Sequence, residues 1–231
     1  MRPLPRILFR SFTQCVAVYQ RVFMDVRILG RENIPRGPKI FAVNHVTSTD
    51  MYWILPVFRD PVHLVLGPSY QFRFLRFVLD RMEMLCALPG ETKTMIESAV
   101  RYLRQGESVV IAPEGDIQEP FRIGPLQPGV AAMYRRARVP IVPMVLAAPK
   151  WNMLELPLRH EINGRVFRTR AVLRGPYGVK FGEPFAPRLE ESGRRDEYES
   201  ILTTLRERLQ SLVDDDCFRG LRDHHNPQRA R

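Results

Sequence analysis

Lys39-Ile40-Phe41-Ala42-Val43-Asn44-His45-Val46-Thr47-Ser48-Thr49-Asp50 joins a short apolar run to a polar turn and the start of a helix. Residues 39–43 are mostly apolar and include β-branched and aromatic side chains, which is typical of a buried strand. The hydroxyl residues 47–49 are all competent N-caps. Asp50 then lies in the first helical turn, where negative charge suits the helix dipole. The pattern predicts a strand-to-helix unit with His45 in its turn.

His45 and Asp50 are five residues apart, so the carboxylate can reach back to the imidazole across such a turn. A carboxylate there holds one ring tautomer and leaves the other nitrogen free to take a proton from a hydroxyl. Two interpretations of this segment alone stay open. His45 is either a general base oriented by Asp50 or, as is commoner for a histidine near a helix cap, a turn residue with a structural role.

Strands and helices alternate outward from this stretch. The helix after the turn ends at Pro56, and short apolar runs and helical stripes follow it. We expect strands at 62–66, 84–88, 108–112, 139–147, 165–174 and 179–181, and helices at 72–79, 94–105, 129–137 and 198–213. This order predicts an α/β fold with a mixed, largely parallel sheet flanked by helices.

Residues 5–27 predict an amphipathic helix, and residues 1–39 hold eight basic and two acidic side chains. Its longest uncharged stretch is only ten residues, whereas a membrane span needs about 20. The apolar stripe either lies on an anionic membrane surface or packs on the domain core. We divide the chain into this membrane-associating segment (1–29), a catalytic-type domain (30–213) and a polar tail (214–231). The tail's His224-His225 is expected to be solvated.

Composition and net charge limit the classes of partner that this chain is expected to bind. The 231-residue chain carries a formal net charge of +10, which favours anionic partners such as acidic phospholipid, phosphorylated small molecules or nucleic acid. The chain lacks helix-turn-helix, zinc-finger and RNP-like signatures, so we expect no nucleic-acid partner. Its three cysteines are far apart, have no metal-ligand spacing and favour a reducing compartment. The first residues lack the long apolar stretch of a signal peptide.

Five stretches in order resemble the glycerophospholipid acyltransferase family, whose best-known members acylate lysophosphatidic acid. The first is the His-x4-Asp motif, preceded here by Asn44. The others are Gly30-Arg-Glu-Asn-Ile-Pro35, Val109-Val-Ile-Ala-Pro-Glu-Gly115, the glycine-led 129–131 with Val139-Pro-Ile-Val-Pro143, and Val179-Lys-Phe-Gly-Glu-Pro184. The resemblance covers about residues 28–213 and implies the glycerolipid acyltransferase fold.

The resemblance also implies a reaction. His45 would deprotonate a lysolipid hydroxyl, Asp50 would orient His45, and a fatty acyl thioester on coenzyme A or acyl carrier protein would be the donor. We expect Asn44, Glu114, Gly115, Asp116 and Arg122 to bind substrate. No metal and no bound cofactor are expected, and the enzyme would be peripheral on the cytoplasmic face of a membrane.

The positions that bind the acceptor's phosphate in the family carry other residues in this chain. Where the family continues Pro-Glu-Gly with Thr-Arg-Ser, this chain has Asp116-Ile117-Gln118, and Leu88-Pro89 lacks the arginine of the family's second motif. The phosphate-binding guanidinium is thus missing, unless Arg73, Arg76, Arg81 or Arg122 replaces it. Lysophosphatidic acid is the default acceptor. The alternatives are another lipid acceptor without a phosphomonoester, or a non-catalytic lipid-binding relative.

Two further expectations concern the reaction itself. Backbone N–H groups near Gly115, or at the helix start after Thr47, are candidates to stabilise a tetrahedral oxyanion. Apolar residues near the pair, such as Tyr52, Trp53 and Leu55, are candidates for the wall of an acyl-chain tunnel, and core packing is the expected role for at least half of them.

Overall fold

The computed structural model describes every residue except 163–164, 189–192, 219–220 and 222–231. A seven-stranded sheet lies at its centre, with the strand order β1-β9-β6-β2-β5-β3-β4. Its strands are β1 (Met24–Leu29), β2 (Ile40–Val43), β3 (Val62–Leu66), β4 (Leu85–Cys86), β5 (Ser108–Ile111), β6 (Ile141–Ala147) and β9 (Gly175–Phe181). A separate antiparallel hairpin is formed by β7 (Leu154–Ile162) and β8 (Arg165–Ala171).

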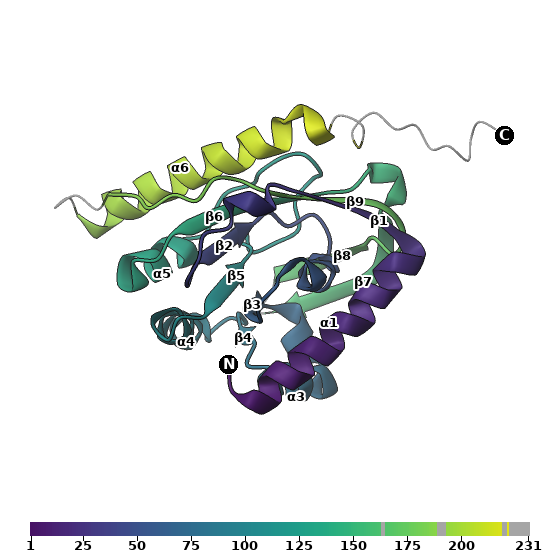
Figure 1. The fold of residues 1–231 in the computed structure, drawn as a ribbon, viewed down its shortest axis with the longest axis horizontal. Helices are drawn as coiled ribbons and strands as arrows, with labels where there is room; N and C mark the ends of the chain where they lie inside the picture. Colours follow the sequence, from purple (N-terminus) through teal and green to yellow (C-terminus); the bar gives the residue numbers. More distant parts are fainter. Residues whose placement is uncertain (163–164, 189–192, 219–220, 222–231) are drawn as a thin grey trace.

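Helices cover the sheet on both sides (Figure 1). They are α1 (Pro3–Phe23), α2 (Asp50–Trp53), α3 (Arg73–Arg81), α4 (Thr92–Arg104), α5 (Gly129–Ala137) and α6 (Arg194–Asp214). Short 3-10 turns occur at Arg31–Asn33, Leu55–Val57, Pro68–Gln71, Lys150–Asn152 and Asp216–Phe218. Strands β6, β2, β5, β3 and β4 are parallel to one another, and β9 pairs antiparallel with β6. The predicted mixed, largely parallel α/β fold is confirmed.

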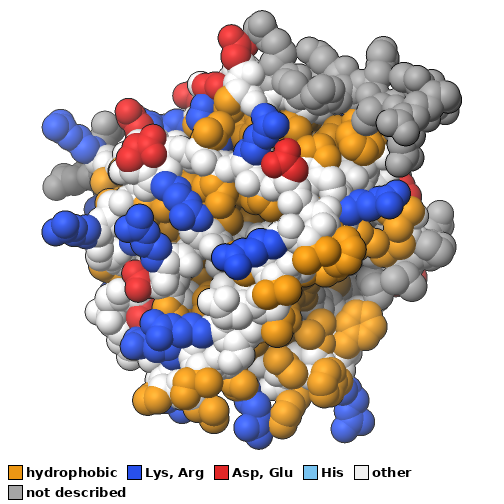
Figure 2. Space-filling model, turned by 45° about the vertical axis from the view of Figure 1, so that its right-hand side comes forward, with side chains coloured by type: hydrophobic (Ala, Val, Ile, Leu, Met, Phe, Trp, Pro, Cys, Tyr) orange, Lys and Arg blue, Asp and Glu red, His pale blue; other side chains and the backbone are white. Residues whose placement is uncertain are grey.

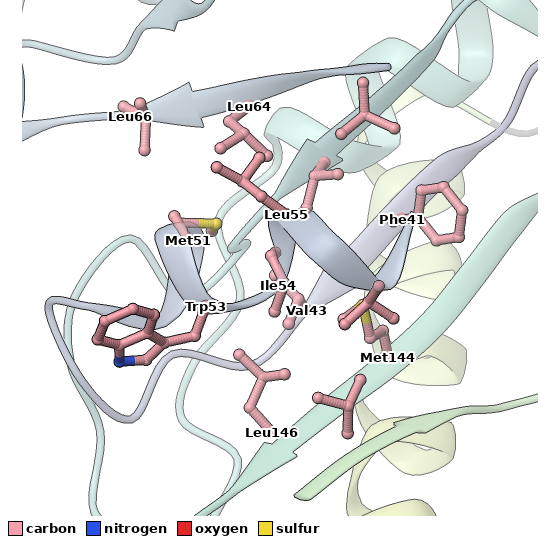
Figure 3. Packing of buried hydrophobic residues seen from close by; sticks show 14 of the residues in the cluster. Phe41, Val43, Met51, Trp53, Ile54, Leu55, Leu64, Leu66, Met144 and Leu146 are labelled. Atoms are coloured by element: carbon pink, nitrogen blue, oxygen red, sulfur yellow. The ribbon is translucent and has the colours of Figure 1, made fainter. Parts of the chain in front are cut away.

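The strands bury both faces, and successive residues contribute to opposite cores, as the period of two along a strand requires. On one face, Phe41 and Val43 of β2 pack with Leu64 of β3 and Met144 of β6 against α1, α2 and α3 (Figure 3). On the other face, the alternate residues of β2, Ile40 and Ala42, pack against α4, α5 and α6. The parallel strands read as continuous apolar runs because both faces are buried.

Helix α1 ends earlier than its sequence pattern predicts. The expected helix ran to residue 27, but Met24–Leu29 forms β1, which pairs in parallel with β9. Met24, Val26 and Ile28 alternate with polar or exposed residues and pack partly buried against the core, so pairing with the sheet outweighs the helical spacing. No helix in the described part of the chain is long and apolar enough to cross a bilayer.

Several other elements also differ from expectation. The hairpin strand β7 was not predicted, and β9 begins at Gly175 rather than at 179. The start of the expected polar tail packs against the domain through Phe218, which is only 2% exposed. The ring of Phe218 lies against Gly178, where a side chain would collide with it. His224-His225 lies outside the described residues.

Candidate active site

A cavity of about 1110 Å³ opens at the carboxyl edge of the parallel strands. Residues that follow four strands within two positions line it: His45 after β2, Gly67 after β3, Ala87 after β4 and Ala112 after β5. Ligands of open α/β sheets bind beyond this edge, where loops can bring side chains from several strands together. The cavity is therefore the candidate active site.

The His45 imidazole is paired with Asp50 at this edge. His45 Nδ1 lies 3.2 Å from Asp50 Oδ2, and the histidine side chain is 20% exposed and lines the cavity. An ionised carboxylate can only accept a hydrogen bond, so Nδ1 carries the proton when the ring is neutral. Nε2 then has a lone pair, which is the requirement for a general base.

Asp50 is completely buried and is held at both oxygens. Its Oδ2 accepts the backbone N–H groups of Val46 and Thr47 at 2.8 and 2.7 Å, in addition to the contact with His45. Its Oδ1 accepts the hydroxyls of Thr47 at 2.6 Å and Tyr177 at 2.9 Å. These donors compensate the burial of the carboxylate and fix its orientation toward the ring. The predicted turn thus closes on itself through Asp50, without a side-chain cap at Thr49.

Tyr177 on β9 is a contact that the sequence analysis missed. Its side chain is 1% exposed, and burial, followed by the charge and hydrogen bond of Asp50, raises the pKa of its phenol well above the usual value. The hydroxyl therefore stays protonated and keeps donating to Asp50. The signal in the sequence was weak, because a tyrosine in a strand is ordinary and its partner is 127 residues away.

Glu114 ties the His45 turn to the loop after β5. Its Oε2 accepts the backbone N–H of His45 at 2.6 Å, and its Oε1 accepts that of Gly124 at 2.7 Å. The carboxyl is 2% exposed, and burial raises its pKa to about 7 against the opposing effect of those two N–H donors. The backbone N–H of Gln118 also donates to the carbonyl of His45 at 2.7 Å. The loop therefore binds both the backbone N–H and the backbone carbonyl of His45.

Comparison with known proteins agrees with this geometry. The model of the family described as Acyltransferase matches residues 25–147, more than half of the 231-residue chain, and the match includes β2, the His45 turn, β5 and Glu114. The chain belongs to the Acyltransferase family.

Two acyltransferases resemble it in particular. A probable 1-acyl-sn-glycerol-3-phosphate acyltransferase of Mycoplasma pneumoniae is 22% identical over 163 residues, which cover 64% of this chain and 59% of that protein. The chain thus aligns with only about three fifths of that relative's length. The crystal structure of the 1-acyl-sn-glycerophosphate (LPA) acyltransferase PlsC from Thermotoga maritima matches with a TM-score of 0.57 at 18% identity. That match covers 87% of this chain and 79% of the PlsC chain, and it shows a common fold.

The five residues expected to bind substrate separate into three groups in this chain. Gly115, with φ of +67°, and Asp116 line the cavity. Asn44 is buried behind it. Its side-chain amide donates to the carbonyl of Leu146 at 3.1 Å and accepts the N–H of Leu146 at 2.7 Å. Glu114 is also behind the wall, and Arg122 is exposed and is not part of the lining. Asn44 and Glu114 therefore have positioning contacts, whereas Gly115 and Asp116 face the space for substrate.

The expected tunnel residues also separate. Tyr52 lines the cavity and its hydroxyl lies 2.7 Å from Ser69 Oγ. Trp53 is instead stacked on Tyr19 of α1, with its indole N–H donating to Val172, and Leu55 is in the core. Trp53 and Leu55 therefore have the core-packing role expected for at least half of these residues, and only Tyr52 of the three lines the cavity.

Two of the backbone donors expected for an oxyanion, those of Gly115 and Ser48, are engaged elsewhere. The N–H of Gly115 donates to the carbonyl of Ala112 at 3.1 Å, and that of Ser48 donates to the carbonyl of Arg170 at 2.7 Å. Stabilising an oxyanion with either group would require that bond to be exchanged.

Two cations that sequence reasoning did not single out line the cavity, Lys93 on α4 and Arg136 on α5. None of the four arginines expected to replace the missing one, Arg73, Arg76, Arg81 and Arg122, is among its described lining residues. In the part of the chain that the structure describes, no group of three His, Cys, Asp or Glu side chains is placed to hold a metal ion.

Proposed function

We propose that this acyltransferase moves a fatty acyl chain from an acyl thioester to the hydroxyl of a lysolipid, with lysophosphatidic acid as the default acceptor. The observation that carries the proposal is the His45–Asp50 pair, in which the ring lines a large cavity while Asp50 is buried and held by four other donors. The names of the two relatives support the choice of acceptor.

The proposed reaction needs one base and no serine nucleophile. His45 Nε2 removes the proton of the acceptor hydroxyl as its oxygen forms a bond to the thioester carbonyl carbon. The tetrahedral oxyanion then collapses, the carbon–sulfur bond breaks, and the departing sulfur takes the proton from His45. Asp50 stabilises the imidazolium in between, because its negative charge faces Nδ1 at 3.2 Å. The donor's carrier, coenzyme A or acyl carrier protein, acts as a co-substrate.

A lipid acceptor without a phosphomonoester is the second candidate, and the position of Asp116 favours it. The carboxylate lines the cavity in a loop whose Gln118 N–H bonds to His45. Ile117, where the family pattern has arginine, also lines the cavity. A phosphomonoester bound there would meet the carboxylate of Asp116 and, at position 117, an isoleucine in place of a guanidinium, which costs about 1–3 kcal/mol for each charge-assisted bond that is not made.

An acceptor panel tests both candidates. With labelled acyl-CoA and purified protein, we expect transfer to lysophosphatidic acid and to lysophosphatidylcholine with kcat/KM values within about tenfold of each other. The double variant Asp116→Thr/Ile117→Arg should raise the preference for lysophosphatidic acid by about 10- to 100-fold, because it removes a repulsive charge and adds a fork for phosphate. Gln118 is kept because its side-chain amide donates to the carbonyl of Asp116 at 3.3 Å in the same loop.

The panel has two adverse outcomes. Wild-type protein that transfers the acyl chain to no lysolipid would refute the proposed function. Wild-type protein that already prefers lysophosphatidic acid by more than about 100-fold would refute the role given to Asp116 and Ile117 while leaving acyl transfer in place.

Peripheral attachment to the cytoplasmic face of a membrane is part of the proposal. Phe9, Val16 and Gln20 of α1 are buried against the domain, whereas large apolar residues elsewhere on α1 and on α3 are exposed. We define the lipid-facing surface as these exposed residues, Leu4, Ile7, Phe12, Val18, Val22, Phe23, Phe74 and Phe77. Figure 2 shows hydrophobic side chains gathered on the lower right of that view, with Lys and Arg around them. Apolar residues edged by cations suit an anionic lipid surface.

Vesicle binding should depend on both parts of this surface. Phe74 and Phe77 are 80% and 54% exposed, so the change of both to Gln should weaken binding to vesicles of phosphatidylglycerol and phosphatidylcholine without unfolding the protein. Binding should also fall as salt rises, since the arginines are screened. Co-sedimentation measures both effects, and Trp151→Gln, also exposed at 38% but outside α1 and α3, is the matched control. Equal binding of the Phe variant and the control would contradict the assignment of this surface.

A further inference from the structure

The cavity has two chemically different ends. Tyr52, Leu66 and Phe72 line one end, on elements that belong to the α1, α2 and α3 side of the sheet. Lys93 and Arg136 line the other end, on α4 and α5, which pack on the opposite face. His45 follows the end of β2 and lines the cavity between these two sides. The side of the lining toward α2 and α3, here called the apolar end, thus has no lysine or arginine among the described residues, whereas the α4–α5 side combines the two cations with apolar residues such as Met95 and Ile96.

Further cations surround the α4–α5 end. The Arg104 guanidinium donates to the carbonyl of Arg136 at 2.9 Å. Arg136 also lines a smaller groove of about 390 Å³ together with Arg101, Arg104 and one acid, Glu97. A second groove of about 670 Å³ shares Pro128 and Tyr198 with the cavity and carries Arg195 and Arg206 with one acid, Glu199. The cavity thus continues into solvent over a surface on which cations outnumber acids.

We propose that Lys93 and Arg136 bind the phosphate groups of the acyl donor's carrier arm, while the acyl chain occupies the apolar end. The inference rests on the proposed function, since it divides the substrates of that reaction within one cavity. An acyl thioester has the required shape: an apolar chain and a phosphorylated pantetheine arm meet at the carbonyl carbon that must lie beside His45. Cations at the cavity mouth would bind such an arm and raise its local concentration.

The position of the cations favours the donor's phosphates over the acceptor's. A lysolipid arrives from the membrane, and the lipid-facing surface lies on α1 and α3. Lys93 and Arg136 lie on the opposite face of the sheet, the side that a water-soluble carrier can reach. The charged residue that follows Glu114-Gly115 in the cavity is Asp116, which disfavours a phosphate near the loop that binds His45.

A series of donors with decreasing phosphate content tests the assignment. The donors are acyl-CoA, acyl-phosphopantetheine and acyl-pantetheine with the same chain, used with lysophosphatidylcholine as acceptor. For the variant Lys93→Gln/Arg136→Gln we expect the KM for acyl-CoA to rise about tenfold and that for acyl-phosphopantetheine to rise less. The KM for acyl-pantetheine, which has no phosphate, should not change. Arg138→Gln, which removes one positive charge beside α5 but outside the cavity lining, is the control.

The acceptor arm of the experiment decides between the two sources of phosphate. With saturating acyl-CoA, the KM for lysophosphatidic acid should be the same in the wild type and the double variant. A rise in that KM, with no dependence on the phosphate content of the donor, would assign the cations to the acceptor and overturn the inference. An equal loss with all three donors would also overturn it, since it would indicate a general structural effect. Failure of the wild type with every donor and acceptor would instead refute the proposed function.

Discussion

His45→Ala is expected to lower kcat/KM for acyl transfer by about 10²- to 10⁴-fold, the range typical for removal of a general base. The backbone of the turn should survive, because the His45 N–H and carbonyl are bound by Glu114 and Gln118 independently of the ring. The imidazole is partly exposed to the cavity, so its removal leaves no void in the core. The loss should therefore appear in turnover and not in stability.

The measurement compares turnover of labelled acyl thioester with thermal unfolding of the same preparation. Ser48→Ala is the matched control, since Ser48 lines the same wall and its hydroxyl has no part in the proposed reaction. It should retain most of the activity. Turnover of His45→Ala close to that of the wild type, or loss of activity in Ser48→Ala alone, would refute the assignment of His45 as the base.

The contact between His45 and Asp50 could be predicted because it is local. His45 and Asp50 are five residues apart, and their contact needs only a strand that ends and a helix that begins between them. The strand pattern that precedes them is strong, since both faces of β2 are buried and Ile40–Val43 is continuously apolar.

The rest of the site depends on distant pairing, which one sequence does not encode in a readable pattern. Tyr177 reaches Asp50 only because β9 pairs antiparallel with β6 beside β2. Lys93 and Arg136 line the cavity because of how α4 and α5 are rotated on the sheet, whereas Arg122, which is nearer in sequence to the Pro-Glu-Gly stretch, is exposed outside it. Residues 24–27 satisfy both helical and strand spacing, and pairing with β9 selects the strand.

Asp50→Asn should lower kcat by about 10²-fold while the turn keeps its geometry. The side-chain oxygen of asparagine would take the place of Oδ2, because Val46 N–H, Thr47 N–H and His45 Nδ1 all donate there. The amide NH₂ would then face the hydroxyls of Thr47 and Tyr177, which can accept a hydrogen bond. The histidine tautomer is thus preserved, and what is lost is the negative charge that stabilises the imidazolium.

Tyr177→Phe is a milder variant against which the loss of kcat in Asp50→Asn can be compared. It removes one donor to Asp50 Oδ1 and leaves the charge and the His45 contact in place, so we expect a loss in kcat of roughly threefold to tenfold. Steady-state kinetics with both substrates saturating, together with thermal unfolding, separates the two effects. Asp50→Asn should lose kcat with little change in Tm, and Tyr177→Phe should lose stability as well, because the carboxylate stays buried with one partner fewer. A kcat in Asp50→Asn equal to or above that of Tyr177→Phe would show that the charge of Asp50 has no part in the reaction, and that His45 works as a base without it.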